Sequence, residues 1–245
     1  MDDIGLPVHG AGTEEALFGL LPTVWLQDHV YRLSPTFFSW AVRAIHGSWF
    51  VVPWLIGLFV SWKRPERIGS FFMCWIALHF IVNPMFAIFP LQPPWMANAE
   101  VTRLVALHAA REIPDNNPLA AMPSLHVALP LLISLWLFRE RWTIPALAML
   151  AYTALVAFEV VLSGEHYVVD VAGGVVVAVA IALAVELSHR FAISRPAARS
   201  QPIASPGGAQ LGVTTPAGLM SQPRVIFLLT GALILLVSVK VALTL

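Results

Sequence analysis

The chain has 245 residues, of which 58% are hydrophobic and 11% charged, whereas an ordinary soluble domain is roughly 45–50% apolar and about 25% charged. A water-soluble globule of this size would lack the polar surface to cover its apolar atoms, so the composition excludes a soluble enzyme and a disordered chain. Fourteen Lys and Arg against fourteen Asp and Glu leave no basic field for nucleic acid, and a single cysteine, Cys74, excludes a disulfide framework and a cysteine-based metal site.

Six segments are apolar enough to cross a bilayer, which takes about 20 mostly apolar residues. In chain order they cover residues 44–62 (or from Pro35), 68–89, 124–138, 142–162, 166–187 and 225–245. The third segment contains Pro130, which predicts a kink there. The predicted fold class is therefore an all-α membrane protein with six transmembrane helices.

Two segments depart from this pattern. Residues 14–33 contain apolar side chains interrupted by Pro22, Gln27, Asp28 and His29, which predicts an interfacial helix lying on the membrane. Residues 195–223 are rich in Pro, Ala, Ser and Gly, which is typical of a flexible linker. The predicted organisation is an interfacial segment (1–34), a five-span domain that carries the candidate site (35–190), a cytoplasmic linker (191–224) and a sixth helix (225–245).

The basic residues predict the orientation in a cell membrane. The loops after the first, third and fifth spans carry nine Lys and Arg: Lys63, Arg64, Arg67, Arg139, Arg141, Arg190, Arg195, Arg199 and Arg224. The loops after the second and fourth spans carry only Arg103 and Arg111. Because basic loops stay in the cytoplasm, both termini and the loop over 90–123 are expected on the extracytoplasmic side.

Three ionisable residues fall where these outer loops meet the spans. His126 begins the third span, and His166 and Asp170 begin the fifth. A four-residue spacing places His166 and Asp170 on one helical face. An imidazole can attack phosphorus if a carboxylate holds its other nitrogen, and a second histidine can protonate the leaving oxygen. We expect Pro123 in the first turn of the third span. The free backbone N–H groups of that turn, together with the Ser124 hydroxyl, would face a bound anion.

Two other interpretations of the three residues remain open at this point. One is a buried polar network that ties the third span to the fifth. The other is a metal site made of two histidines and one aspartate.

Pro-Ser-Leu-His over 123–126, followed forty residues later by His-Tyr-x-x-Asp over 166–170, resembles the type 2 phosphatidic acid phosphatase superfamily. The usual motifs of that superfamily are Pro-Ser-Gly-His and Ser-Arg-x5-His-x3-Asp. The leucine variant, with Phe-Pro-x-x-Pro-Pro over 89–94, is similar to the branch of inositol phosphorylceramide synthase and its bacterial relatives.

The resemblance implies a role for each matching residue. His166 would be the nucleophile that forms a phosphohistidine, Asp170 would orient it, and His126 would be the acid for the leaving group. Tyr167, Pro93 and Pro94 would belong to the substrate site. No metal or other cofactor is expected for this reaction.

The chain departs from the family at the residues that bind phosphate. The Ser-Arg pair corresponds to Glu159 and Val160, and Trp95 stands where the synthase-like branch has arginine after the double proline. Arg103 and Arg111, eight residues apart, are the basic residues of the outer loop and would share a helical face, with His108 beside them. They are the predicted phosphate-binding residues, and solvated loop charge or headgroup contact is the alternative.

The predicted function is therefore a membrane enzyme that breaks a phosphoester or phosphoanhydride bond of a membrane lipid. With water as acceptor it would be a lipid phosphatase, and with an alcohol such as inositol or a ceramide it would be a phosphotransferase. The rival hypothesis is a non-enzymatic lipid transporter or headgroup-binding scaffold. A transporter predicts polar residues along a path through the membrane, whereas here they gather at one face, which favours the enzyme.

Overall fold

The computed structural model describes residues 9–88, 90–106 and 119–194. These residues form helices and connecting loops, and they contain no β-strand beyond an isolated bridge between Leu91 and Ala120. The all-α prediction is confirmed for them. The helices are α1 His9–Phe18, α2 Pro22–His29, α3 Pro35–Trp49, α4 Val52–Lys63, α5 Ile68–Ile88, α6 Pro94–Ala97, α7 Leu125–Arg139, α8 Thr143–Leu162 and α9 Val168–Ser194, with single 3-10 turns at Tyr31–Leu33 and Pro65–Arg67.

Three helical segments of the described chain are long and apolar enough to cross a membrane: Pro65–Ile88, Thr143–Leu162 and Val168–Ser188. They correspond to the second, fourth and fifth predicted spans. α9 begins two residues later than expected and runs to Ser194, past the predicted domain boundary at 190. The sixth predicted span and the rest of the linker lie outside the described residues, so the count of six remains a prediction.

The first predicted span is two helices rather than one. α3 and α4 are bent by 43° at the break between Trp49 and Val52. Pro53, in the first turn of α4, explains the break, because a proline ring clashes with the carbonyl four residues earlier, which here belongs to Trp49. The pair counts as a fourth span only if the two helices cross together.

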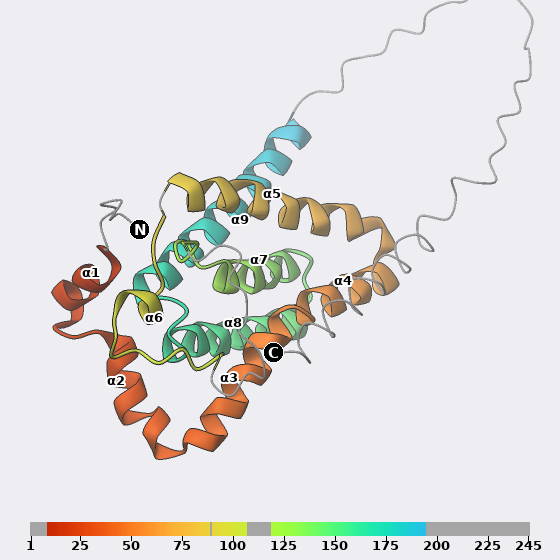
Figure 1. The fold of residues 1–245 in the computed structure, drawn as a ribbon. Coiled ribbons are helices and arrows are strands. Elements are labelled where there is room, and N and C mark those ends of the chain that lie inside the picture. The colour runs from red at the N-terminus through yellow and green to blue at the C-terminus, as the bar shows by residue number, and fades with distance from the viewer. Residues whose placement is uncertain (1–8, 89, 107–118, 195–245) are drawn as a thin grey trace, which may run out of the picture.

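α7 is the central helix of the bundle and lies between α5 and α8, with α9 behind it (Figure 1). Its fifteen residues are fewer than an isolated spanning helix needs. Nearly every side chain from Val127 to Leu137 is buried, including Pro130, Ser134 and Trp136. A helix that is buried on all sides needs no polar face, which explains why this segment is uniformly apolar.

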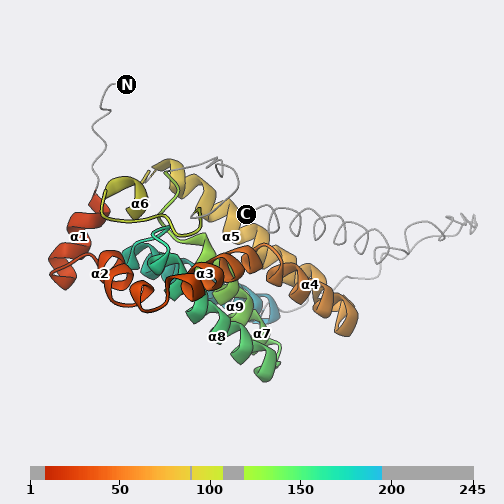
Figure 2. The ribbon, with the colours of Figure 1, turned by 60° about the horizontal axis from the view of Figure 1, so that its bottom comes forward.

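The N-terminal segment forms two short helices and a turn rather than the single interfacial helix that the sequence predicts. Gly19, with φ of +72°, ends α1, and Pro22 begins α2. α1 contacts α6 and α9, and α2 contacts α8, so both helices cover one end of the bundle (Figures 1 and 2). Leu17, Phe18, Leu20, Trp25 and Leu33 stay exposed, as expected for a segment at a membrane surface.

Candidate active site

The candidate site lies where α8 ends and α7 and α9 begin. α8 ends in a Schellman motif: the Gly164 N–H donates to the Val161 carbonyl at 3.3 Å, and the Glu165 N–H donates to the Val160 carbonyl at 3.0 Å. Gly164 has φ of +83°. A Cβ there would also approach Val101 Cγ1 to 2.7 Å, so both the backbone conformation and the packing require glycine. This turn places His166 directly before α9.

Asp170 fixes the start of α9. One carboxylate oxygen, Oδ2, accepts the Tyr167 N–H at 2.8 Å, which is the N3 half of a capping box. The same oxygen lies 3.6 Å from Nδ1 of His166, an ion-pair contact longer than a hydrogen bond. The His166 side chain is almost fully buried and Asp170 is completely buried. The predicted contact between these two residues is therefore present, although His166 lies before α9 rather than within it.

His126, in the first turn of α7, faces His166 from the other side. Its Nδ1 lies 3.1 Å from His166 Nε2, and the ring centroids are 5.3 Å apart. The Ser124 N–H donates to the Asp170 carbonyl at 3.0 Å and ties the two helix starts together. A Cβ on Gly174 would collide with the Ser124 carbonyl oxygen, so glycine at 174 allows α9 to approach α7 this closely.

Ser124 is the N-cap of α7, and Pro123 precedes it. The expectation that Pro123 occupies the first turn of this helix is therefore wrong by two positions. The Ser124 side chain is completely buried, and its Oγ has no hydrogen-bond partner among the described residues. No side chain of the described chain caps α7, so its first N–H groups remain available to an anion.

Arg103 lies beside the site but is already engaged. Its guanidinium binds the Glu165 carboxylate at 2.7 and 3.3 Å and stacks over the Trp95 ring at 4.3 Å. Glu165 is the residue directly before His166, so the structure brings Arg103 to the nucleophile candidate. His108 and Arg111, the other predicted phosphate-binding residues, lie outside the described residues.

The remaining predicted substrate residues support the loop around the site. Pro93 and Pro94 are buried and begin α6. The next N–H, from Trp95, donates to the Gly164 carbonyl at 3.2 Å. Tyr167 is fully buried in a cluster with Leu21 and Val101. Burial, with the Asp170 and Glu14 carboxylates nearby, raises the pKa of the Tyr167 phenol to about 12.

Glu14, which the sequence placed in the interfacial segment, reaches this site from α1. Its carboxylate accepts the backbone N–H groups of Val168 and Val169 at the start of α9. The side chain is fully buried, and burial raises its pKa from 4.5 to about 7. Glu14 is thus a long-range cap for α9, a role that only the folded chain reveals.

Two further residues join the site without a sequence motif. The His46 ring on α3 packs against the His126 ring with centroids 4.8 Å apart. The Oε1 atom of Glu159, on α8, lies 3.4 Å from His46 Nδ1. The sequence signal for both was weak, since it was only an ionisable residue within an apolar segment.

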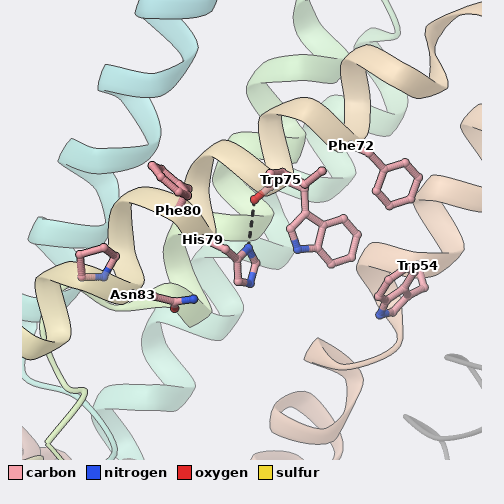
Figure 3. A pocket seen from close by; sticks show the side chains of 8 residues that line it. Trp54, Phe72, Trp75, His79, Phe80 and Asn83 are labelled. Carbon is pink, nitrogen blue, oxygen red and sulfur yellow. Dashed lines mark hydrogen bonds between the residues drawn. The ribbon is translucent and has the colours of Figure 1, made fainter.

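A separate hollow faces outward between α4 and α5. It has a volume of about 580 Å³, and Figure 3 shows Trp54, Phe72, Trp75, Phe80, His79 and Asn83 around it. His79 Nδ1 donates to the Trp75 carbonyl at 3.0 Å. None of the residues described above at the ends of α7, α8 and α9 lines this hollow.

Within residues 9–88, 90–106 and 119–194, no group of three His, Cys, Asp or Glu side chains has a geometry that could hold a metal ion. Buried polar atoms without a hydrogen-bond partner gather instead around the histidines. Within the same ranges they include Ser124 Oγ, His166 Nδ1, Asp170 Oδ1 and both carboxylate oxygens of Glu159. Such atoms are costly in a fold and are typical of a binding or catalytic site.

Fold and site together define an all-helical membrane protein with a histidine–carboxylate centre at one end of its bundle. The family model of the PAP2 superfamily matches residues 14–184, a range that begins within α1 and includes the complete histidine centre. The chain therefore belongs to the PAP2 superfamily, the type 2 phosphatidic acid phosphatases. Members are generally phosphatases or phosphotransferases of lipid phosphates, and membership supports an enzyme of this kind. No curated protein and no solved structure matches the chain.

Proposed function

We propose that this protein transfers a phosphoryl group from a membrane lipid phosphate to His166 and then to an acceptor. The observation that carries the proposal is the geometry of one ring. His166 has Asp170 at its Nδ1 side, at 3.6 Å, and His126 at its Nε2 side, at 3.1 Å. An imidazole flanked in this way has one nitrogen oriented by a carboxylate and the other facing a proton donor.

In the first half-reaction, Nε2 of His166 attacks phosphorus and the bond from phosphorus to the leaving oxygen breaks. His126 gives that oxygen a proton, and the lipid alcohol departs. Asp170 stabilises the charge that develops on His166. The uncapped N-terminus of α7, with the buried Ser124 hydroxyl, supports binding of the phosphoryl oxygens there.

The second half-reaction decides whether the protein is a phosphatase or a phosphotransferase. His126, now neutral, takes a proton from the acceptor while the acceptor oxygen attacks phosphorus and releases His166. Water gives inorganic phosphate, whereas inositol or a ceramide gives a new phosphoester. The acidic N-terminus and the basic loops support an extracytoplasmic site.

The test is phosphoenzyme trapping with purified protein and a panel of labelled lipids: phosphatidic acid, its lyso form, a polyprenyl diphosphate, and phosphatidylinositol with ceramide. We expect an acid-labile, base-stable phosphohistidine in the wild type and none in His166→Ala. Lys63→Ala, at the opposite end of the bundle, is the control and should match the wild type.

Two results would overturn the proposal. The first is turnover by His166→Ala at more than a small fraction of the wild-type rate. The second is a folded wild type that transfers phosphate from no lipid of the panel yet moves lipids between leaflets, which is the transporter hypothesis. Label released as inorganic phosphate, or found in an alcohol product, separates hydrolysis from transfer.

A further inference from the structure

We propose that His46 and Glu159 form a positioning pair that holds the His126 ring toward His166. The inference rests on the proposed function, because it concerns the proton donor of that reaction. His46 lies outside the motifs that carry the family resemblance, and Glu159 stands where the family has the serine of its Ser-Arg pair, a position at which this chain departs from the motif.

The first argument is packing. The ring of His126 is contacted from α3 by two rings one helical turn apart. His46 lies at 4.8 Å between centroids with planes 36° apart, and Trp49 lies at 4.7 Å with planes 47° apart. These rings occupy the space into which the His126 ring would otherwise rotate. Nδ1 of His126 is thereby kept 3.1 Å from His166 Nε2.

The second argument is the cost of burying Glu159. Its side chain is 1% exposed, and neither carboxylate oxygen has a hydrogen-bond partner among the described residues. Its nearest charged or chargeable partner of opposite sign is His46, at 3.4 Å. An unbonded buried carboxylate costs several kcal/mol, and an ionisable residue at such a place is functional by default. If residue 159 served packing alone, glutamine or leucine would fill the space without the cost of a buried charge.

The third argument is the order of charges. Asp170, His166, His126, His46 and Glu159 form one row in which a carboxylate stands at each end. Asp170 stabilises the positive charge that forms on His166. Glu159 pairs with His46, so the ring that packs against His126 is itself held in place by a carboxylate.

The experiment compares two substrates that differ in their need for a proton. Phosphatidic acid, or the panel lipid that the wild type turns over fastest, has an alkoxide leaving group that must be protonated. 4-Nitrophenyl phosphate leaves as a stable anion and needs no acid. Because general acid catalysis contributes typically 10²–10⁴-fold, we expect Glu159→Gln and His46→Gln to lower kcat on the lipid about 10- to 100-fold. Turnover of the aryl ester should stay within about 2-fold of the wild type.

Two controls make the comparison specific. Glu140→Gln removes a carboxylate whose side chain is 9% exposed and pairs with Arg67 away from the site, and it should leave the turnover of both substrates unaffected. In a His126→Gln background, Glu159→Gln should cause no further loss, because its effect passes through His126. Thermal unfolding in detergent identifies any variant that fails to fold.

The inference is overturned if Glu159→Gln and His46→Gln slow both substrates equally, or if their losses add fully to that of His126→Gln. Failure of the proposed function would look different. The wild type would then form no phosphohistidine, or His166→Ala would stay active, and the inference about His46 and Glu159 would fail together with the proposed function.

Discussion

The ion pair of Arg103 with Glu165 allows the phosphate-binding prediction to be tested by a double-mutant cycle. Arg103→Ala removes a guanidinium that is 18% exposed in its side chain and leaves Glu165, 11% exposed, without its partner. Breaking a fully buried pair costs about 3–5 kcal/mol. For this partly exposed pair we expect about 1–3 kcal/mol of lost stability after solvent screening. If Arg103 also binds the transferred phosphoryl group, its loss costs a further factor of about 30 to 1000 in turnover, or roughly 2–4 kcal/mol.

Glu165→Gln in the Arg103→Ala background separates the two effects, because it removes the unpaired charge. Stability is measured as Tm in detergent, and turnover as kcat/KM on the lipid that the wild type prefers. A phosphate-binding arginine predicts that the double variant regains most of its Tm but stays 30- to 1000-fold slower than the wild type. If the double variant regains wild-type turnover, Arg103 only supports the loop and the prediction is refuted.

Three further predictions concern packing, pH and orientation. Gly174→Ala should lower the free energy of unfolding by about 1–3 kcal/mol and lower turnover, because its Cβ would push α9 away from the Ser124 carbonyl. Gly173→Ala, whose Cβ would meet only ordinary contacts at 3.4 Å or more, is the matched control. Equal effects of the two substitutions would contradict the argument. Because the pKa of Glu14 rises from 4.5 to about 7 on folding, the folded state binds the extra proton, so stability contributed at this site falls as pH rises from 4.5 to about 7. Glu14→Gln should therefore match the wild-type free energy of unfolding near pH 5 and exceed it at pH 8 by about 1–2 kcal/mol after solvent screening. Thermal unfolding at the two pH values measures this, and a difference independent of pH would contradict the assignment. In a Cys74→Ser background of intact cells, Glu100→Cys should react with a membrane-impermeant thiol reagent and Glu66→Cys should not; both positions are exposed, and the reverse pattern would place the site in the cytoplasm.

The sequence predicts those helices whose apolar runs are uninterrupted. The bounds of α5 and α8 agree with expectation within two residues, although α5 contains Pro84 in its interior. The first span was predicted as one helix although Pro53 lies inside it. A proline can either kink a helix or end it, and here the bend of 43° depends on how α3 packs against α8, which no local pattern contains.

Some contacts of the candidate site were likewise predictable from the local sequence, whereas others depend on how distant segments pack together. The pairing of His166 with Asp170 follows from a spacing of four residues, so it was predictable before the fold was known. His126 was placed by its motif and by the topology of the spans. His46, Glu159 and Glu14 come from distant parts of the chain, and only the packing of α3 and α1 against the ends of α7, α8 and α9 brings them together. Arg103 was correctly placed near the site, but its pairing with Glu165 could not be read from the sequence.

The N-termini of α7 and α9 explain why the phosphoryl group is expected at α7 rather than at α9. The N-terminus of a helix attracts anions through its free N–H groups and its dipole. At α9 those groups are already used: Glu14 accepts the N–H groups of Val168 and Val169, and Asp170 accepts that of Tyr167. At α7 no side chain of the described chain serves as a cap, and the buried Ser124 hydroxyl lacks a partner there. A phosphate at α9 would have to displace a buried carboxylate, whereas at α7 it would satisfy groups that are otherwise left unpaired, directly beside His126 and His166. The dipole of α9 is thus free to stabilise Asp170, the carboxylate that we propose orients His166.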